Sequence, residues 1–242
     1  MTSPTAPHGA PPSPGTERPP PPPFFPRARA PRPPPVCAAI IGGSVALFVV
    51  DAVLTQGATL SPYERLGPLS QWLALYGPLV QDGQYWRVLS CSLAHRGPLH
   101  LAFNMWVAYS LGSLYERAIG SGRFLLLSII TALGSSAFAL LFNFKVPAVG
   151  ASGMILGYGG AMLVTAKRQF RRGIIFWLAQ MAVLSLIPGV SWAGHLGGFL
   201  FGLPVGVALR SGHPVFVRAA PLLLIIAVAV VYITAHPERF RG

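Results

Sequence analysis

The sequence predicts an all-α membrane protein, and two observations carry this prediction. The chain has 242 residues, of which 52% are hydrophobic and only 10% are charged. So few charged residues cannot cover the surface of a soluble protein. The second observation is a series of apolar segments, each near the ~20 residues that a helix needs to cross hydrocarbon. These segments are 37–56, 94–115, 124–143, 149–166, 173–189, 192–210 and 215–235.

The N-terminal residues 1–35 form a proline-rich, low-complexity stretch that ends in Arg27, Arg29 and Arg32. Such a stretch cannot bury a core, so we expect a disordered tail. It does not match a signal peptide, because the first apolar segment begins too late and is too long. The tail is either a solvated extension or a docking site for a proline-reading domain, and the sequence leaves both possibilities open.

A long loop, 57–93, separates the first two apolar segments and is rich in aromatic residues. Trp72, Tyr76, Tyr85 and Trp86 lie in it. Because Trp and Tyr collect at the boundary between lipid and water, we expect this loop to lie in the membrane interface.

Basic residues set the expected orientation. The 18 Lys and Arg against 6 Asp and Glu give a net charge of +12. They fall between the apolar segments, which is the pattern of a multi-pass membrane protein rather than of a nucleic-acid-binding protein. With the N-terminus inside, the inner side holds Arg18, Arg27, Arg29, Arg32, Arg117, Arg123, Lys167, Arg168, Arg171, Arg172, Arg210 and Arg218, and the outer side holds only Arg65, Arg87, Arg96, Lys145, Arg239 and Arg241.

This asymmetry predicts a multi-pass protein of the cell membrane with a cytoplasmic N-terminus and an outer C-terminus. An organelle membrane stays open as the alternative. Cys37 and Cys91 would then lie at opposite faces of the membrane, too far apart for a disulfide.

Five polar residues lie near the predicted outer ends of three different apolar segments. At ~1.5 Å of rise per residue they share one depth in the membrane. Ionisable side chains inside a membrane are rare and commonly mark functional sites. We therefore expect one site that opens to the outer side. Its residues are His95, His100 and Asn104 in the second segment, Ser152 in the fourth and His195 in the sixth.

Ser152 stands between Gly150 and Gly153 at the start of an apolar segment. Glycine allows a sharp bend, and unpaired N–H groups at a helix N-terminus can stabilise a developing oxyanion. This arrangement suits a nucleophile. The same small residues also suit a close contact between two membrane helices.

Glycine faces on the fourth and sixth segments would bring His195 beside Ser152. Small residues four apart make a flat face that allows close helix approach. A serine with a base within reach is the minimal activated nucleophile. No acidic residue stands at that depth in these segments, so we expect a dyad without an aspartate. The faces consist of Gly194, Gly198, Gly202 and Gly206 on one side and Gly153, Gly157 and Ala161 on the other.

His100 and Asn104 are four residues apart and therefore share a helix face. Both can donate hydrogen bonds to an oxyanion, or they can bridge two helices. His95 lies off this face, nearer the surface, where it can fix the loop. A transporter or metal carrier that binds zinc through His95, His100 and His195 is a further hypothesis, although no carboxylate stands at their depth.

Together these motifs resemble the rhomboid family of intramembrane serine proteases over most of residues 37–235. Each motif alone is weak, and their combination is specific. The motifs are Trp86-Arg87, His95-x4-His100-x3-Asn104, Glu116-Arg117, Gly150-Ala-Ser-Gly153 and Gly194-His195-x2-Gly198-x3-Gly202.

The resemblance implies a six-helix rhomboid-like catalytic core at 36–211, followed by an additional C-terminal transmembrane helix and a short tail at 212–242. It implies a serine-type endopeptidase without cofactor or metal that cleaves single-span transmembrane proteins in the lipid bilayer. The oligomeric state is left open. The implied roles are nucleophile for Ser152, base for His195, oxyanion donors for His100, Asn104 and the Ser152 N–H, and supporting residues His95, Trp86, Arg87, Gly150 and Gly153.

The sequence departs from the family pattern at two positions. Leu156 stands where the family usually has Phe or Tyr, which stacks on the catalytic histidine, and Tyr158 is expected to face elsewhere. Ala193 replaces a residue that is polar in many members. An inactive rhomboid-like protein that binds membrane helices is therefore the alternative, although such relatives usually lack the serine or the histidine.

Overall fold

The computed structural model describes residues 34–61 and 66–240, and these residues fold into helices joined by short loops. Residues 1–33 of the tail that is predicted to be disordered lie outside the described residues, and its last residue, Pro35, is the first residue of α1. Within them the structure contains no sheet and only one isolated β-bridge, between Leu75 and Ala148. The predicted all-α class is confirmed.

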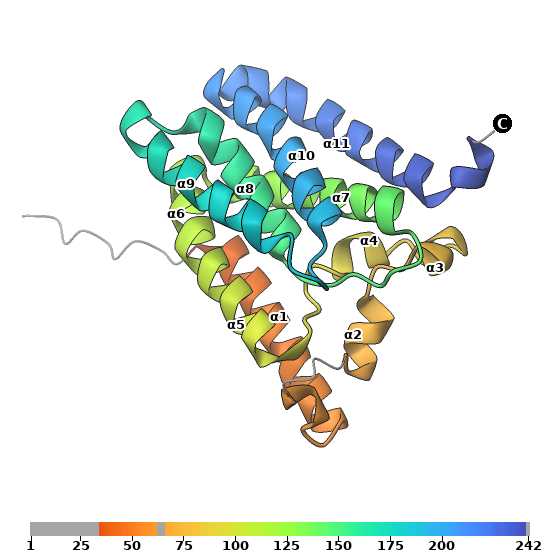
Figure 1. Ribbon diagram of the computed structural model, residues 1–242. Coiled ribbons are helices and arrows are strands. Elements are labelled where there is room, and N and C mark those ends of the chain that lie inside the picture. Colours follow the sequence, from red (N-terminus) through yellow and green to blue (C-terminus); the bar gives the residue numbers. More distant parts are fainter. Residues whose placement is uncertain (1–33, 62–65, 241–242) are drawn as a thin grey trace, which may run out of the picture. The chain divides into compact units, whose positions relative to one another are not determined.

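Each apolar segment of the sequence is helical (Figure 1). By length and composition, α1, α7, α10 and α11 can each cross a membrane. The helices are α1 (Pro35–Leu54), α5 (Gly97–Val107), which continues through the π-helical turn η2 (Ala108–Gly112) into α6 (Ser113–Ile119), α7 (Ser121–Asn143), α8 (Ser152–Thr165), α9 (Arg168–Leu184), α10 (Trp192–Arg210) and α11 (His213–Ala235).

The bounds of α9 differ most from the sequence prediction. The predicted segment was 173–189, whereas the helix begins at Arg168 and ends at Leu184. Leu186 and Ile187 continue the apolar run but lie in a turn. Pro188 follows them, and its ring and missing N–H disfavour a helix there. The run of apolar residues continues through the turn, so hydropathy alone does not show where the helix ends.

The N-terminus of α1 is fixed by a carboxylate from α6. Glu116 is buried and accepts hydrogen bonds from the backbone N–H groups of Val36, at 3.0 Å, and Cys37, at 2.7 Å. These are among the N–H groups that a helix start leaves without intrahelical partners, and a negative charge there is favourable. Glu116 thus ties α1 to α6.

A seam of glycines joins α8 to α10. A Cβ atom added to Gly198 would overlap the carbonyl oxygen of Gly153, and one added to Gly202 would overlap that of Gly157. One added to Gly206 would lie 2.8 Å from the Cα atom of Ala161. The predicted pairing of the two small-residue faces is therefore confirmed.

Three helices, α7, α9 and α11, pack against α8 or α10 beside this seam (Figure 1). α7 packs against both α8 and α10, and α11 packs against α7 and α10. α9 packs against α8, where Trp177 and Leu178 lie over Gly159.

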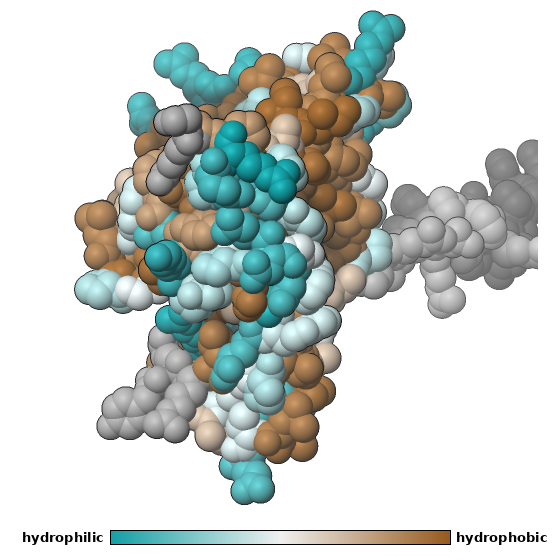
Figure 2. Space-filling view, turned by 90° about the vertical axis from the view of Figure 1, so that its right-hand side faces the viewer, coloured by the Kyte–Doolittle hydropathy of each residue, from teal (hydrophilic) through white to brown (hydrophobic). Residues whose placement is uncertain are grey.

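The loop 57–93 contains the short helices η1 (Ala58–Leu60), α2 (Pro68–Leu73), α3 (Gly77–Gln81) and α4 (Arg87–Ser90). On the face that these helices share with the end of α11, Figure 2 shows a band of hydrophilic residues with hydrophobic residues on both sides. Such a surface agrees with one end of a bundle whose sides face lipid.

Candidate active site

Ser152 is the first residue of α8, directly after a sharp bend. Gly150 has a φ of 120°, in the region that favours glycine, and its N–H donates to the carbonyl of Cys91 at 2.9 Å. The loop before it is held by two hydrogen bonds of 2.9 Å between Leu75 and Ala148. The sequence prediction that Ser152 opens a helix is confirmed, so its N–H belongs to the unpaired first turn.

His195 lies in the first turn of α10. Ser191 caps this helix by accepting a hydrogen bond from the Gly194 N–H at 3.3 Å. The His195 Nε2 atom is 2.7 Å from the Ser152 Oγ atom, and both side chains are half-buried. The glycine seam therefore brings a serine hydroxyl and an imidazole into hydrogen-bond contact, which is the geometry of a nucleophile and its base.

The second imidazole nitrogen of His195 contacts a residue that the sequence reasoning missed. His195 Nδ1 is 2.6 Å from the Ser185 Oγ atom. Ser185 follows the last residue of α9 and is buried. The sequence offers no carboxylate at this depth as a partner for this nitrogen, and residue 185 falls within the predicted spanning segment 173–189. The available signal was a serine before Pro188-Gly189, within an otherwise apolar run.

His100 lies on α5 beside the bend that precedes Ser152. Its Nδ1 atom accepts a hydrogen bond from the Arg96 N–H at 3.3 Å, so in the neutral ring Nε2 carries the hydrogen. A Cβ atom placed on Gly150 would lie 2.9 Å from His100 Nε2 and 3.9 Å from Ser152 Oγ. The Nε2–H donor is therefore close to the bend at Gly150 that precedes Ser152.

Asn104 and His95 lie behind His100. Asn104 is buried and donates its amide to the His100 carbonyl at 2.9 Å, one turn further along α5. His95 is also buried, donates from Nδ1 to the Leu93 carbonyl at 3.0 Å, and has its ring centre 5.1 Å from that of His100. Both residues contact His100 or its loop, and neither is among the residues that line the cavity at Ser152.

Trp86 and Arg87 lie in the loop 57–93 and not in the cavity at Ser152. Trp86 stacks on Trp72 with 5.3 Å between ring centres. The buried Arg87 guanidinium donates to the carbonyls of Gln71, at 2.9 Å, and Ala74, at 2.7 Å. These contacts hold the short helices of the loop together.

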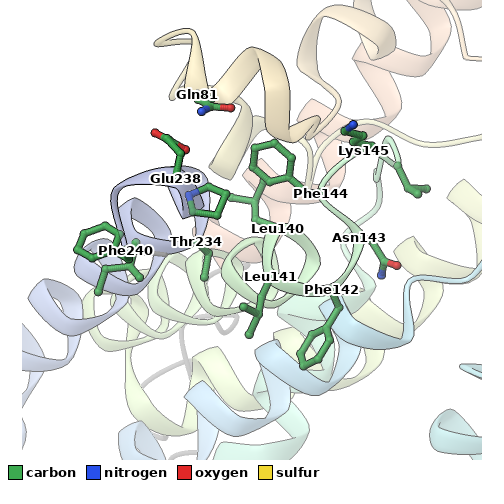
Figure 3. Close-up of a pocket in the computed structure, with 13 residues that line it drawn as sticks. Gln81, Leu140, Leu141, Phe142, Asn143, Phe144, Lys145, Thr234, Glu238 and Phe240 are labelled. Carbon is green, nitrogen blue, oxygen red and sulfur yellow. The ribbon is translucent and has the colours of Figure 1, made fainter. Parts of the chain in front are cut away.

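The cavity at Ser152 has a volume of about 500 Å³ and is lined by His100, Arg96, Ser191 and the α7–α8 loop. A larger cavity of about 860 Å³ lies between α3, the end of α7 and the end of α11 (Figure 3). Its walls are mainly apolar, with Lys145 and Glu238 at its rim, and no serine–histidine pair lines it. The smaller cavity is therefore the candidate active site.

The described residues contain no group of three His, Cys, Asp or Glu side chains placed to hold a metal ion. Both ring nitrogens of His195 face serine hydroxyls. His95 and His100 contact each other by ring edge instead. Among the described residues, the three histidines of the zinc hypothesis therefore do not form one group placed to hold a metal ion.

Leu156 and Tyr158 occupy the part of α8 that departs from the family pattern. Leu156 is buried. Tyr158 is hydrogen-bonded to Ser128 at 2.9 Å and packs on Phe124, so the prediction that it faces away from the site is confirmed. In the part of the chain that the structure describes, no aromatic ring stacks on the His195 imidazole.

Comparison with known proteins gives the following similarities. Residues 82–212, more than half of the chain, match the family model described as "Rhomboid domain". The chain is 33% identical to the rhomboid protease GluP of Bacillus subtilis over 170 residues, which cover 65% of this chain and 33% of GluP. It is 33% identical over 162 residues to the mitochondrial RHOMBOID-like protein 6 of Arabidopsis thaliana, covering 63% of this chain and 51% of that one.

A third relative is the rhomboid protease GlpG of Yersinia enterocolitica, with 30% identity over 180 residues. That alignment covers 70% of this chain and 60% of GlpG. The chain thus spans between a third and three fifths of the length of these curated relatives.

Proposed function

Because the chain belongs to the rhomboid family, we propose that it is an intramembrane serine endopeptidase that cleaves peptide bonds in or near the transmembrane helices of single-span proteins. The family and the apolar helices make the chain an integral membrane protein. The observation that carries the proposal is the 2.7 Å contact between Ser152 Oγ and His195 Nε2.

In this mechanism Ser152 Oγ attacks the carbonyl carbon of the scissile peptide bond while His195 Nε2 takes the hydroxyl proton. The imidazolium then gives this proton to the leaving amine, and an acyl-enzyme remains. Water attacks the acyl carbonyl while His195 Nε2 takes a proton from it. The ester bond to Ser152 Oγ then breaks, the imidazolium returns the proton to Ser152 Oγ, and the carboxyl product leaves. Each step needs only groups that line or border the cavity at Ser152, together with water.

The oxyanion that forms during attack needs hydrogen-bond donors that are already oriented. We assign the Ser152 N–H and the His100 Nε2–H to this role, since both lie at the bend that starts α8. Asn104 is the third candidate. One of its amide hydrogens goes to the His100 carbonyl, and the amide nitrogen carries a second.

We further propose that the cavity opens to the outer side of a cell membrane and that the N-terminus is cytoplasmic. The distribution of Lys and Arg supports this orientation. The hydrophilic band in Figure 2 fits a wet outer end, because hydrolysis requires water to reach Ser152.

The test is co-expression of a tagged single-span substrate, with a glycine-rich outer helix end, with wild-type protein or with Ser152→Ala. We expect a shorter fragment on a blot with the wild type and none with the variant, because the substitution removes the hydroxyl that contacts His195 Nε2. Ser211→Ala is the control, since this hydroxyl lies at the far end of α10 and, among residues 34–61 and 66–240, is hydrogen-bonded only to the Val207 carbonyl, at 2.9 Å.

A fragment made equally by wild type and Ser152→Ala would assign the cutting to another protease. No fragment from several such substrates, with well-expressed protein, would support instead an inactive rhomboid-like protein that binds membrane helices.

A further inference from the structure

Ser185 occupies a special position on a loosely packed helix. No residue along α9 itself is buried, whereas Ser185, which caps its C-terminal end, is only 8% exposed. Its hydroxyl makes two short contacts, to the Met181 carbonyl oxygen at 2.6 Å and to His195 Nδ1 at 2.6 Å. This is the point at which α9 touches the candidate catalytic pair.

The two contacts fix the direction of both hydrogen bonds. A carbonyl oxygen only accepts, and a serine hydroxyl has a single hydrogen, so the Ser185 hydrogen goes to Met181. Ser185 Oγ must then accept a hydrogen from His195 Nδ1. In a neutral imidazole a hydrogen on Nδ1 leaves the lone pair on Nε2, which is the nitrogen that faces Ser152 Oγ.

We propose that Ser185 is the positioning residue of the catalytic pair, holding His195 in the tautomer whose Nε2 can accept the Ser152 proton. This proposal rests on the proposed protease function. Ser185 acts through His195 and touches neither Ser152 nor the reacting carbonyl. Its hydroxyl takes the place that a carboxylate has in a three-residue catalytic triad.

A hydroxyl differs from a carboxylate in a way that matters during the reaction. When Nε2 takes the Ser152 proton, the ring becomes positively charged while Nδ1–H continues to donate to Ser185 Oγ. The neutral oxygen orients this cation with less electrostatic stabilisation than an anion would give. Among the described residues, no aromatic side chain stacks on the His195 imidazole. The hydrogen bond to Ser185 therefore fixes a ring that has no such support.

The test compares two serines with the same local structure. Ser185 and Ser211 each follow the last residue of a helix and donate to the carbonyl four residues earlier, but only Ser185 contacts a histidine. Ser185→Ala should lower kcat for the single-span substrate by about ten- to hundredfold, the effect of one hydrogen bond to a charged group, and leave KM nearly unchanged. Ser211→Ala should leave both at the wild-type level, and Ser185→Thr, which retains a hydroxyl, should restore most of kcat.

A kcat for Ser185→Ala within about twofold of the wild type would overturn the proposal, as would an equal loss in Ser211→Ala. A second measurement does not depend on turnover. In protein with ¹⁵N-labelled histidine, the resonances of His195, assigned with His195→Gln, should show the hydrogen on Nδ1, and Ser185→Ala should shift population to the Nε2–H tautomer.

The two measurements separate failure of this proposal from failure of the proposed function. A hydrogen on Nε2 in the wild type would overturn the positioning role even in an active protease. A hydrogen on Nδ1 that depends on Ser185, in a protein that cleaves nothing, would support the positioning role and reject the protease function.

Discussion

Two of the helices that pack against α8, α9 and α10, contact it in opposite ways. α10 meets it along a seam where glycine Cα atoms face carbonyl oxygens, so there is no room for a side chain between the two helices at Gly198 and Gly202. α9 meets it through side chains such as Trp177, and no residue of α9 is buried. Aromatic and aliphatic side chains of α9, among them Phe176 at 67% exposed, point away from the protein.

This difference divides the proposed catalytic task between two kinds of structure. The seam carries Ser152 and His195 and sets the distance between them. The loosely packed helix supplies Ser185, which sets the state of the His195 ring. A fixed distance demands backbone packing, whereas one hydrogen bond suffices to select a tautomer.

The largest effect is expected from Gly198→Ala, which breaks the seam. The added methyl group would overlap the Gly153 carbonyl, so α8 and α10 must separate. We expect the free energy of unfolding to fall by about 2 to 3 kcal/mol, which is the upper end of the usual range for overpacking. The cost is high because backbone atoms cannot move aside as side chains do. Cleavage should fall by about a hundredfold, since a 1 Å displacement of reacting groups has that effect.

Reversible denaturation in mixed micelles and the rate of substrate cleavage measure these two losses. Wild-type stability in Gly198→Ala would contradict the seam, because the methyl group would then have found space between the helices. A loss of stability with normal cleavage in the folded fraction would show that the seam holds the fold but not the catalytic distance.

A smaller effect is expected from Trp177→Ala, which weakens the contact between α9 and α8. The half-buried indole lies over Gly159, and its removal forfeits packing contacts. We expect a loss of about 1 to 2 kcal/mol in unfolding free energy and less than about a tenfold loss of cleavage, because Ser185 becomes less well held.

The matched control is Phe176→Ala, an aromatic neighbour on α9 that is 67% exposed. It should change stability by less than half as much as Trp177→Ala. Equal losses of unfolding free energy in the two variants would mean that the loss comes from removing any large apolar side chain of α9 from its surroundings. The contact between Trp177 and α8 would then not be its cause.

Much of the fold could be predicted from the sequence because lipid simplifies the problem. A helix must satisfy its own backbone in a membrane, so apolar length alone locates the elements. The limits of 192–210 agree with those of α10, Trp192–Arg210. Glycines four residues apart predicted which faces of α8 and α10 meet, and thereby the contact of Ser152 with His195.

The sequence prediction of helix limits was wrong where an apolar run continues beyond the end of a helix. The last turn of α9 is followed by apolar residues, so hydropathy predicts an end at residue 189, whereas the helix ends at Leu184. For the same reason Ser185 was hidden inside a predicted span. A single hydroxyl in an apolar run has no spacing pattern that identifies its partner, and only the fold brings it to His195.

The smallest effect is expected from Gly173→Ala on α9, which makes the same chemical change as Gly198→Ala. Nothing lies within 4 Å of a Cβ atom placed on Gly173, and alanine is the better helix former. Stability should therefore stay the same or rise by no more than about 1 kcal/mol, with cleavage at the wild-type level. Comparing Gly198→Ala with Gly173→Ala separates the effect of a methyl group inside the seam from the general effect of replacing a helical glycine by alanine. A loss in Gly173→Ala as large as in Gly198→Ala would mean that this face of α9 is covered in the membrane, and the contrast between a rigid α10 and a loosely packed α9 would not hold.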